Sequence, residues 1–241
     1  MNQIQMLSNQ LSDSLSGAVL RIGITGGIGS GKSYVCRQLE AAGHRVFYCD
    51  DEAKRIIRTD PEVKEELQHL VGEQVYDADG QLVKRVLSSY LCRGRDYAHR
   101  VDDIVHPRVA AAFSVAALQM AGQRQGKSRA DGFFHRGTNS DAYNAADGRA
   151  HREMKPQPVG VQQLRDLQPG EVIFMECALL FESKFDSLVD CSVLVHVSQA
   201  TQLARLMARD GISEDKAREW MALQLGEEEK MRRADYVLDN E

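Results

Sequence analysis

The sequence is poor in cysteine, proline and aromatic residues, and it has no strong excess of charge of either sign. Its five cysteines are widely spaced and form no C-x-x-C pair, which argues against a disulfide framework and against a zinc site. We therefore expect reduced thiols in a cytoplasmic protein. The net charge of −5 gives no general attraction to nucleic acids or anionic membranes, so neither is an expected partner.

Long apolar runs are also missing, because no run approaches the length of a membrane span. The first 19 residues lack the basic and apolar regions of a signal peptide. They are polar and rich in Ser, Gln and Asn, so we expect a flexible N-terminal tail over residues 1–19. Residues 20–241 are long enough for one α/β domain with a buried core.

A specific functional signal lies in residues 20–33, which read LRIGITGGIGSGKS. A strand-like apolar segment leads into the pattern G-x-x-x-x-G-K-[ST], and a helix-like segment follows it. Glycines let backbone N–H groups converge on a phosphate, because positive φ costs them little and no Cβ blocks the approach. The helix that begins near Gly31 adds its dipole. Lys32 is expected to reach the β- and γ-phosphates and Ser33 to ligate Mg²⁺, so the pattern predicts binding of a nucleoside triphosphate.

Two acidic residues, Asp50 and Asp51, follow the next predicted strand, residues 45–48. In open α/β sheets ligands bind at the carboxyl ends of the strands, which suits a chemical role for one of them. Either residue would equally serve as the cap of a helix over residues 52–58. The pattern by itself favours neither alternative.

Residues from about 61 to 115 have the apolar spacing of amphipathic helices, with a polar turn at residues 77–80. His106-Pro107 is expected to interrupt this pattern before a further helix over residues 109–118. A lone His beside Pro is more often a structural residue than a catalyst. A helical block between two strands suits a subdomain that holds a substrate, and packing alone would explain it equally well.

Residues from about 120 to 168 are polar and rich in Gly, Ser, Asn, Arg and Gln, and no apolar period holds. This segment is too long for an ordinary connection and too polar to pack, so we predict a surface insertion that is largely disordered. Its modest basic excess favours a solvated loop over a binding patch.

Beyond this insertion, apolar runs at residues 172–175 and 193–197 predict two buried parallel strands, and residues 236–238 a short final one. Glu176 closes the first run in a pattern similar to a Walker B motif, which any central parallel strand can resemble.

An Arg-bearing helical pair separates the last two of these strands. Ser198 is expected to cap a helix over residues 201–209, and Ser213 a second helix. Arg205 and Arg209 are four residues apart and share one side of the first helix. They suit the stabilisation of phosphate charge during phosphoryl transfer, and a solvated helix face is an equally good interpretation.

Several motifs occur here in the order in which they occur in dephospho-CoA kinases: ITGGIGSGKS, VFYCDDEAKRII, DADGQLVKRVL, DDIVHPRV, ALLFES, SQATQLARLMARDGISEDKA with Gln224, and ADYVLDN. From about residue 20 to its end, apart from the insertion, the sequence resembles this family. The resemblance implies an α/β fold of the P-loop NTPase type, a three-layer sandwich with a parallel central sheet. It also implies a helical substrate-binding subdomain at about residues 53–118 and a lid at about residues 205–232.

The resemblance further implies ATP-dependent phosphorylation of the ribose 3′-hydroxyl of dephospho-CoA, the last step of coenzyme A biosynthesis, with ATP and Mg²⁺ as cofactors. It makes Asp50 the candidate general base, or the group that orients the 3′-hydroxyl. The full catalytic set is Asp50, Lys32, Arg205 and Arg209, where the two arginines lie in the lid. The nucleotide-binding set is Gly27, Ile28, Gly29, Ser30, Gly31, Lys32, Ser33 and Tyr34. The acceptor-binding set is His106, Lys84, Leu179 and Leu180.

The sequence departs from the family's pattern at several positions. Ala178 replaces the usual Pro of a PLLFE-type turn, and Tyr48 replaces the first acid of a D-A-D style motif. Lys84 stands where an acceptor-side Arg is expected, and Lys lacks the planar fork with which Arg binds phosphate. Tyr34 occupies the place of a small Thr. The sequence ends at residues 240–241, where relatives continue into a last helix that packs on the core.

Three alternatives remain at this point: another P-loop kinase of small molecules or nucleotides, a nucleotide-binding relative that has lost catalysis, and a switch GTPase. Residues 77–80 match D-x-x-G, but they lie in a polar turn and no N-K-x-D motif occurs, which disfavours the GTPase. We expect a monomer or a small homo-oligomer.

Overall fold

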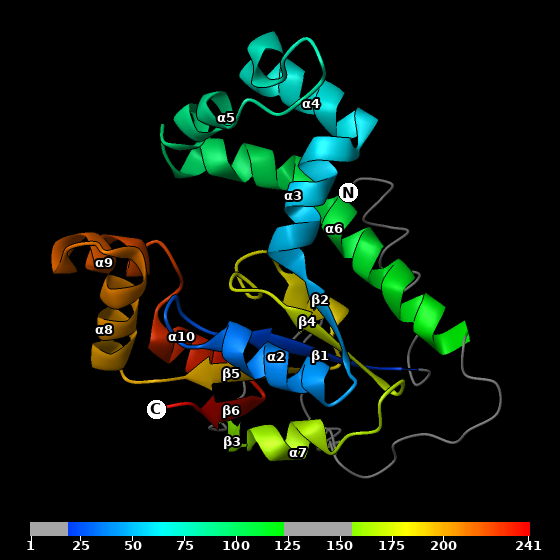
Figure 1. Ribbon diagram of the computed structural model, residues 1–241, viewed down its shortest axis with the longest axis vertical. Helices are drawn as coiled ribbons and strands as arrows, with labels where there is room; N and C mark the ends of the chain where they lie inside the picture. Colours follow the sequence, from blue (N-terminus) through cyan, green and yellow to red (C-terminus); the bar gives the residue numbers. More distant parts are fainter. Residues whose placement is uncertain (1–18, 123–155) are drawn as a thin grey trace, which may run out of the picture. The chain divides into compact units, whose positions relative to one another are not determined.

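The computed structural model describes residues 19–122 and 156–241 (Figure 1). The chain forms two compact units. The helical unit contains Phe47–Gln119, and the sheet unit contains the described residues of Gly17–Val46 and Met120–Glu241. The predicted N-terminal tail, except for residue 19, and most of the predicted insertion lie outside the described residues.

The sheet unit is built on a six-stranded sheet with the order β2-β4-β1-β5-β6-β3. The strands are β1 (Leu20–Thr25), β2 (Arg45–Tyr48), β3 (Gln157–Pro158), β4 (Val172–Glu176), β5 (Cys191–His196) and β6 (Tyr236–Asp239). β1 pairs in parallel with β4 and β5, and β6 pairs in parallel with β5 and β3. The predicted parallel α/β fold is therefore confirmed.

The three central strands, β4, β1 and β5, are buried along almost their whole length because both of their faces are covered. Ile22, Ile24 and Phe174 are fully buried, as expected for strands of a parallel sheet with helices on both sides. At the start of β1, the partly buried Arg21–Asp190 ion pair, 2.8 Å between Nη2 and Oδ1, connects β1 to the residue before β5.

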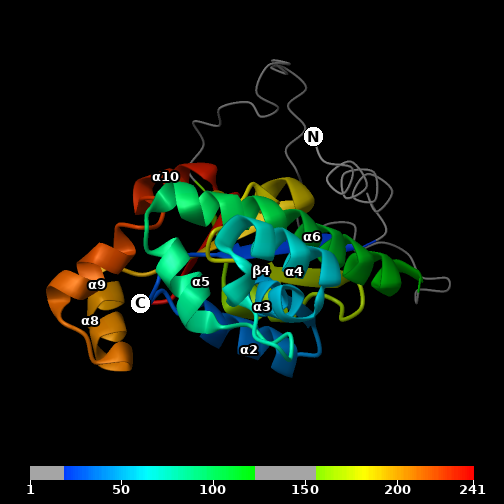
Figure 2. The same cartoon turned by 90° about the horizontal axis from the view of Figure 1, so that it is seen from above.

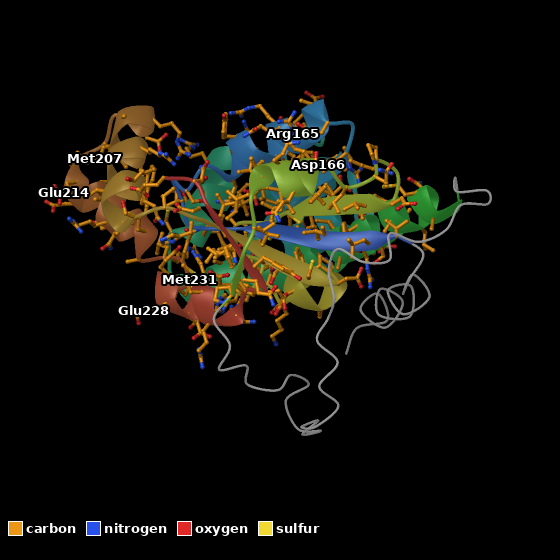
Figure 3. The ribbon with its side chains drawn as sticks, turned by 90° about the horizontal axis from the view of Figure 1, so that it is seen from below. Arg165, Asp166, Met207, Glu214, Glu228 and Met231 are labelled. Atoms are coloured by element: carbon orange, nitrogen blue, oxygen red, sulfur yellow. The ribbon has the colours of Figure 1, made fainter. Side chains whose placement is uncertain are left out.

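Helices lie on both faces of this sheet. The sheet unit contains α2 (Lys32–Ala41), α7 (Val161–Arg165), α8 (Gln199–Asp210), α9 (Glu214–Met221) and α10 (Glu227–Arg233), with a short 3₁₀ helix, η2 (Phe185–Leu188). Figure 3 shows α7, labelled at Arg165, and α10, labelled at Met231, on opposite sides of the sheet. α8 and α9 lie side by side at one end of the unit (Figures 1 and 2).

The predicted insertion extends too far along the chain. Residues 156–168, which we expected to be disordered, include β3 and α7. Val159, Leu164 and Leu167 are buried there. These three apolar residues are separated by polar ones, so no period was visible, yet together they pack α7 onto the sheet unit next to α2.

The helical unit contains α3 (Cys49–Thr59), α4 (Pro61–Val71), the 3₁₀ helix η1 (Glu73–Val75), α5 (Lys84–Leu91) and most of α6 (Arg95–Gly122). Asp60 caps α4 by accepting a hydrogen bond from the Val63 N–H, and Pro61 occupies the first helical position, where its missing N–H costs nothing. The buried side chains Val63, Leu67, Leu87 and Tyr90 come from α4 and α5.

The structure decides one open alternative about these helices and shows that one expectation is wrong. α3 begins at Cys49 with Tyr48 as its N-cap residue, so Asp50 and Asp51 lie in the first turn and neither caps the helix. α6 runs through Pro107 without ending. Pro costs a helix one hydrogen bond, and the buried side chains on both sides of it, Val105 and Val109, provide packing that outweighs this loss.

Among the described residues, α6 is also the one helix long and apolar enough, by length and composition, to cross a membrane. Polar residues interrupt the apolar ones along α6, so the sequence contains no uninterrupted apolar run of that length. The core helix of a globular unit has the same length and composition. The buried Phe113, whose ring lies 5.4 Å from that of Phe47, shows such core packing.

Candidate active site

The glycine-rich loop between β1 and α2, residues 26–31, is tightly folded. Gly26, Gly29 and Gly31 have φ values of 152°, 81° and 91°, which L side chains rarely adopt. A Cβ on Gly29 would lie 2.6 Å from the Gln202 carbonyl oxygen, and one on Gly31 would collide with the Asn240 side-chain nitrogen. Glycine is therefore required at both positions by conformation and by space.

Lys32 and Ser33 form the first turn of α2, where backbone N–H groups are unsatisfied and the helix dipole is positive. The Lys32 Nζ donates to the carbonyl oxygens of Gly26, at 2.9 Å, and Gly27, at 3.2 Å, so its side chain folds back over the loop. Ser33 and Tyr34 are exposed. These donors fit a triphosphate, and the exposed hydroxyl of Ser33 is an oxygen ligand of the kind that Mg²⁺ prefers.

Arg205 lies at the edge of this loop. Its Nη2 donates to the backbone oxygen of Asn240 at 3.0 Å, and its Nη1 is 3.6 Å from the place where a Cβ on Gly31 would be. Arg209, one turn later on α8, pairs instead with Asp210 at 2.7 Å between Nη2 and Oδ2, with 60% of its side chain exposed. The structure thus brings Arg205, and not Arg209, to the loop.

Sequence reasoning missed three amide side chains as site residues. The Ile28 N–H donates to Oε1 of Gln224 at 2.8 Å, and Nδ2 of Asn240 donates to the Ser30 carbonyl oxygen at 2.9 Å. Gln202 is buried against Gly27 and Gly29. Gln224 and Asn240 both belong to motifs that we recognised, but no local pattern indicated which atoms they contact.

Cys36 is a buried residue of α2, and the carboxylate of Glu176, at the end of β4, acts on its thiol. Burial, and next the Glu176 carboxylate, raise the pKa of the Cys36 thiol to about 12. The thiol is therefore protonated at neutral pH and is no nucleophile. Glu176 ends β4 as the sequence indicated, and its charge acts on the helix that begins at Lys32.

In the turn after β4, Leu179 and Leu180 differ in exposure. Leu180 is fully buried, whereas 37% of Leu179 is exposed. A Cβ on Gly23 of β1 would lie 2.9 Å from the Leu180 Cδ2, so Leu180 packs directly on the central strand. Of the two predicted acceptor-binding leucines, Leu179 is the one that a ligand can reach without rearrangement.

The helical unit holds Asp50, His106 and Lys84. Asp50 and Lys84 are exposed in the first turns of α3 and α5. The His106 Nε2 lies 3.5 Å from Oδ1 of Asp102, with 28% of its side chain exposed. Burial lowers the pKa of His106 below its ordinary value, and the charges of Asp102, Asp103 and Asp50 oppose this shift. Asp50 and His106 therefore interact electrostatically within this unit.

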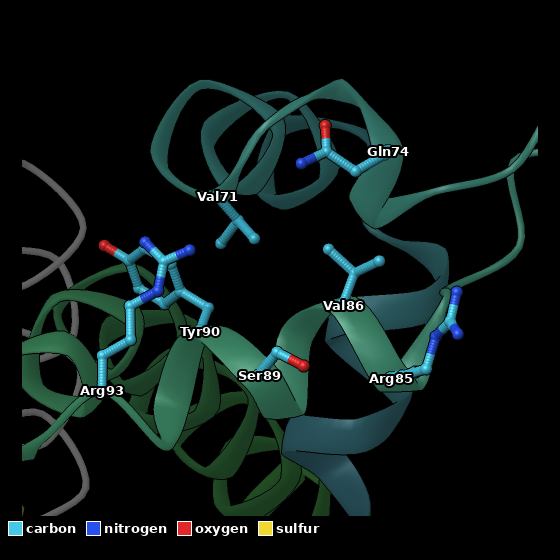
Figure 4. A pocket seen from close by; sticks show the side chains of 7 residues that line it. All are labelled: Val71, Gln74, Arg85, Val86, Ser89, Tyr90 and Arg93. Carbon is cyan, nitrogen blue, oxygen red and sulfur yellow. The ribbon is translucent and has the colours of Figure 1, made fainter.

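A pocket of about 370 Å³ lies in the helical unit beside α5. Figure 4 shows Val71 and Val86 facing each other across it, with Arg93 beside the Tyr90 ring at one end and Arg85 at the other. It is lined by Val71, Gln74, Arg85, Val86, Ser89, Tyr90 and Arg93. None of the predicted acceptor-binding residues is among these, although Lys84 directly precedes the lining residue Arg85.

Comparison with known proteins places the P-loop, the parallel sheet and the helical unit in one family. A sequence profile described as dephospho-CoA kinase matches residues 20–125 and 154–241. The chain belongs to the dephospho-CoA kinase family. The stretch that the family profile leaves unmatched falls inside the predicted insertion.

Individual dephospho-CoA kinases are similar over almost the whole chain. The protein of that name from Bacteroides fragilis is 33% identical over 92% of this chain and 85% of its own length. The one from Salinibacter ruber is 33% identical over 91% and 88%.

Two solved structures share the fold. TT1252 from Thermus thermophilus has a TM-score of 0.59 at 26% identity and covers 92% of this chain and 89% of its own. Dephospho-CoA kinase from Campylobacter jejuni has a TM-score of 0.50 at 14% identity and covers 93% and 89%. Such a low identity supports the fold alone.

Proposed function

We propose that this protein transfers the γ-phosphoryl group of ATP to the ribose 3′-hydroxyl of dephospho-CoA, giving ADP and coenzyme A. Membership of the dephospho-CoA kinase family supports the reaction. The observation that carries the nucleotide half of the proposal is the glycine loop of residues 26–31, with Lys32 folded over it and Arg205 at its edge.

The loop and the start of α2 bind the phosphates in this proposal. Backbone N–H groups of the loop and of the first turn of α2 are the donors to the phosphates. Those of Ile28, Ser30 and Tyr34 are already used, because they donate to Gln224, Gly27 and Gly31. Lys32 exchanges its two carbonyl partners for oxygens of the β- and γ-phosphates, to which its charge adds attraction. Ser33 would hold Mg²⁺, which when bound neutralises charge on these phosphates.

Arg205 and Arg209 complete the phosphate site from α8. Phosphoryl transfer proceeds through a transition state whose charge is spread over the transferred group, so cations from a closing segment lower its energy. Arg205 is already placed at the loop edge. Arg209 is one turn farther and exchanges its Asp210 partner for a phosphate only if the lid segment, residues 205–232, closes.

Asp50 is the proposed general base, or the group that orients the 3′-hydroxyl, because it presents an exposed carboxylate in the first turn of α3. His106, whose lowered pKa favours the neutral ring at neutral pH, is proposed to hold the acceptor by hydrogen bonding. Lys84 is proposed to contact the acceptor as a cation and Leu179 as an apolar surface, with Leu180 supporting Leu179 from the core.

The test is ADP release from ATP and Mg²⁺ with dephospho-CoA as acceptor, beside adenosine, AMP, pantetheine and no acceptor. We expect turnover with dephospho-CoA alone, and coenzyme A as its product. Turnover with AMP or adenosine instead would assign a different P-loop kinase. Nucleotide binding without turnover on any acceptor would assign a relative that has lost catalysis.

The cysteines bear on the proposed cellular location of the protein. All five cysteines, which lie within the described residues, are outside disulfides, and Cys92 is the exposed one. Reduced thiols are typical of the cytosol, so we propose a cytoplasmic enzyme that acts on a small-molecule substrate as a monomer or small homo-oligomer.

A further inference from the structure

The phosphate-binding loop is tied at two points to the last quarter of the chain. Oε1 of Gln224 accepts the Ile28 N–H at 2.8 Å, and Nδ2 of Asn240 donates to the Ser30 carbonyl oxygen at 2.9 Å. Gln224 follows α9, and Asn240 follows β6. Two side chains from separate elements therefore hold backbone groups that lie two residues apart in the loop.

Asn240 connects three parts of the sheet unit through three different atoms. Its N–H donates to the His196 carbonyl oxygen at the end of β5, at 2.9 Å. Its carbonyl oxygen accepts from Arg205 Nη2 at 3.0 Å, and its side chain reaches Ser30. A Cβ on Gly31 would collide with this same side chain, so the loop and the amide fit each other closely.

Both side chains are themselves held from neighbouring residues. The Leu225 N–H, next to Gln224, donates to Oε1 of Glu182 at 2.8 Å. Asp235 accepts bonds from the N–H and hydroxyl of Ser192, both at 2.9 Å, which aligns β6 with β5 and so places Asn240. The backbone at Gln224 and at Asn240 is thus fixed by neighbouring hydrogen bonds, so both amide side chains are already positioned beside the loop.

We propose that Gln224 and Asn240 are positioning residues that hold the loop in its phosphate-binding conformation. A glycine-rich loop loses much conformational freedom when it is ordered. Bonds that order it before the ligand arrives spare the ligand that cost. The inference rests on the proposed function in one respect, that the loop binds a nucleotide.

Alanine variants of the two residues test this directly. Asn240→Ala removes the bond to Ser30 and keeps the backbone bonds to His196 and Arg205, and Gln224→Ala removes the bond to Ile28. We expect each variant to bind ADP and ATP about fivefold more weakly by calorimetry, since one hydrogen bond has about this net value. ADP and ATP should lose the same factor, because both place a β-phosphate in the loop.

The unfolding temperature of each variant, measured without nucleotide, distinguishes a general loss of stability from a loss of loop positioning. Ser213→Ala is the matched control, because it removes the side-chain cap of α9 and contacts no loop residue. We expect this control to lower the unfolding temperature and keep ADP affinity within twofold. Gln224→Met keeps the length of the side chain and removes its acceptor oxygen, so it should weaken ADP binding as Gln224→Ala does.

Three results would overturn the proposal: ADP affinity within twofold of wild type in both alanine variants, full affinity in Gln224→Met, or equal loss of affinity in Ser213→Ala. Failure of the proposed function has a different signature. A wild-type protein that binds ADP and ATP but transfers no phosphate to dephospho-CoA contradicts the kinase assignment and leaves the affinity comparison intact.

Discussion

The phosphate-binding loop of the sheet unit and the candidate acceptor residues of the helical unit are held in different ways. The loop is fixed through its backbone, by Lys32, Gln224 and Asn240. The acceptor candidates Asp50 and Lys84 present exposed side chains from the first turns of two helices. A phosphate is recognised by N–H groups that every residue has, whereas a particular acceptor is recognised by particular side chains.

A pocket in the helical unit is lined by residues other than the predicted acceptor set. The pocket beside α5 is lined by Arg85 and Arg93 along with apolar walls. Arg85 lies in the family motif DADGQLVKRVL, directly after Lys84, and Arg93 lies outside the quoted motifs. Side chains on helix surfaces vary without disturbing the fold.

The sharpest test of the comparison is Asp50→Asn. If Asp50 acts on the acceptor alone, we expect turnover with dephospho-CoA to decrease by roughly 10²–10⁴-fold, the usual size of a general-base effect, with ATP affinity nearly unchanged. Steady-state kinetics and calorimetry measure the two quantities. The matched control is Asp51→Asn, since Asp51 lies in the same turn and pairs with Lys54 at 3.0 Å. Turnover close to wild type in Asp50→Asn would remove Asp50 from this role.

Lys32→Ala tests the other member of the comparison, the glycine loop of the sheet unit. Loss of one positioned donor to developing charge costs about 10²–10³-fold in rate, and here we also expect weaker ATP binding, because the cation contacts the bound phosphates. Turnover and ATP affinity are measured together. Arg37→Ala changes an exposed cation on the same helix and should leave both intact. A Lys32→Ala protein with normal affinity and rate would contradict the P-loop assignment.

The leucine pair after β4 separates packing from recognition. Leu180→Ala should lower the free energy of unfolding by about 2–5 kcal/mol, as for other fully buried leucines. Leu179→Ala, at an exposed position, should change it by less than about 0.5 kcal/mol while raising KM for dephospho-CoA. Denaturant unfolding and acceptor kinetics check the two effects. Equal stabilities of the two variants would show that Leu180 is not a core residue.

The smallest effect we expect is a pH dependence from the helical unit. Because burial lowers the folded-state pKa of His106 below its ordinary value of 6.5, the unfolded chain binds this proton first as pH decreases. Stability should then decrease as pH is lowered from about 6.5 through the folded-state pKa.

Asp102, Asp103 and Asp50 act on this ring and oppose the shift. His106→Asn removes the titrating ring, so unfolding measured between pH 7.5 and 5.5 should decline less in this variant than in wild type. An identical decline would assign it to other groups.

Much of the sheet unit could be predicted from local sequence. The apolar runs of β4 and β5, the glycine loop and the caps Ser198 and Ser213 were all visible, because each is decided by residues within a few positions. The continuity of α6 through Pro107 could not be predicted, since the packing of Val105 and Val109 outweighs a local helix-breaking preference. The ordered helix α7 was not predicted for a similar reason, because its few apolar residues form no local pattern and stabilise it by being buried.

The features of the candidate site also divide into those that local sequence predicted and those that only the tertiary structure decided. By itself the sequence determined the tight glycine turn at residues 26–31, because its conformation depends on glycine within one contiguous segment. Phosphate binding there is a prediction that rests on the same short segment. The tertiary structure alone decided that Arg205 reaches the loop while Arg209 pairs with Asp210. It also decided that Gln224 and Asn240 hold that loop. Such contacts join residues about 200 positions apart, and their geometry follows from the strand order and not from any local pattern.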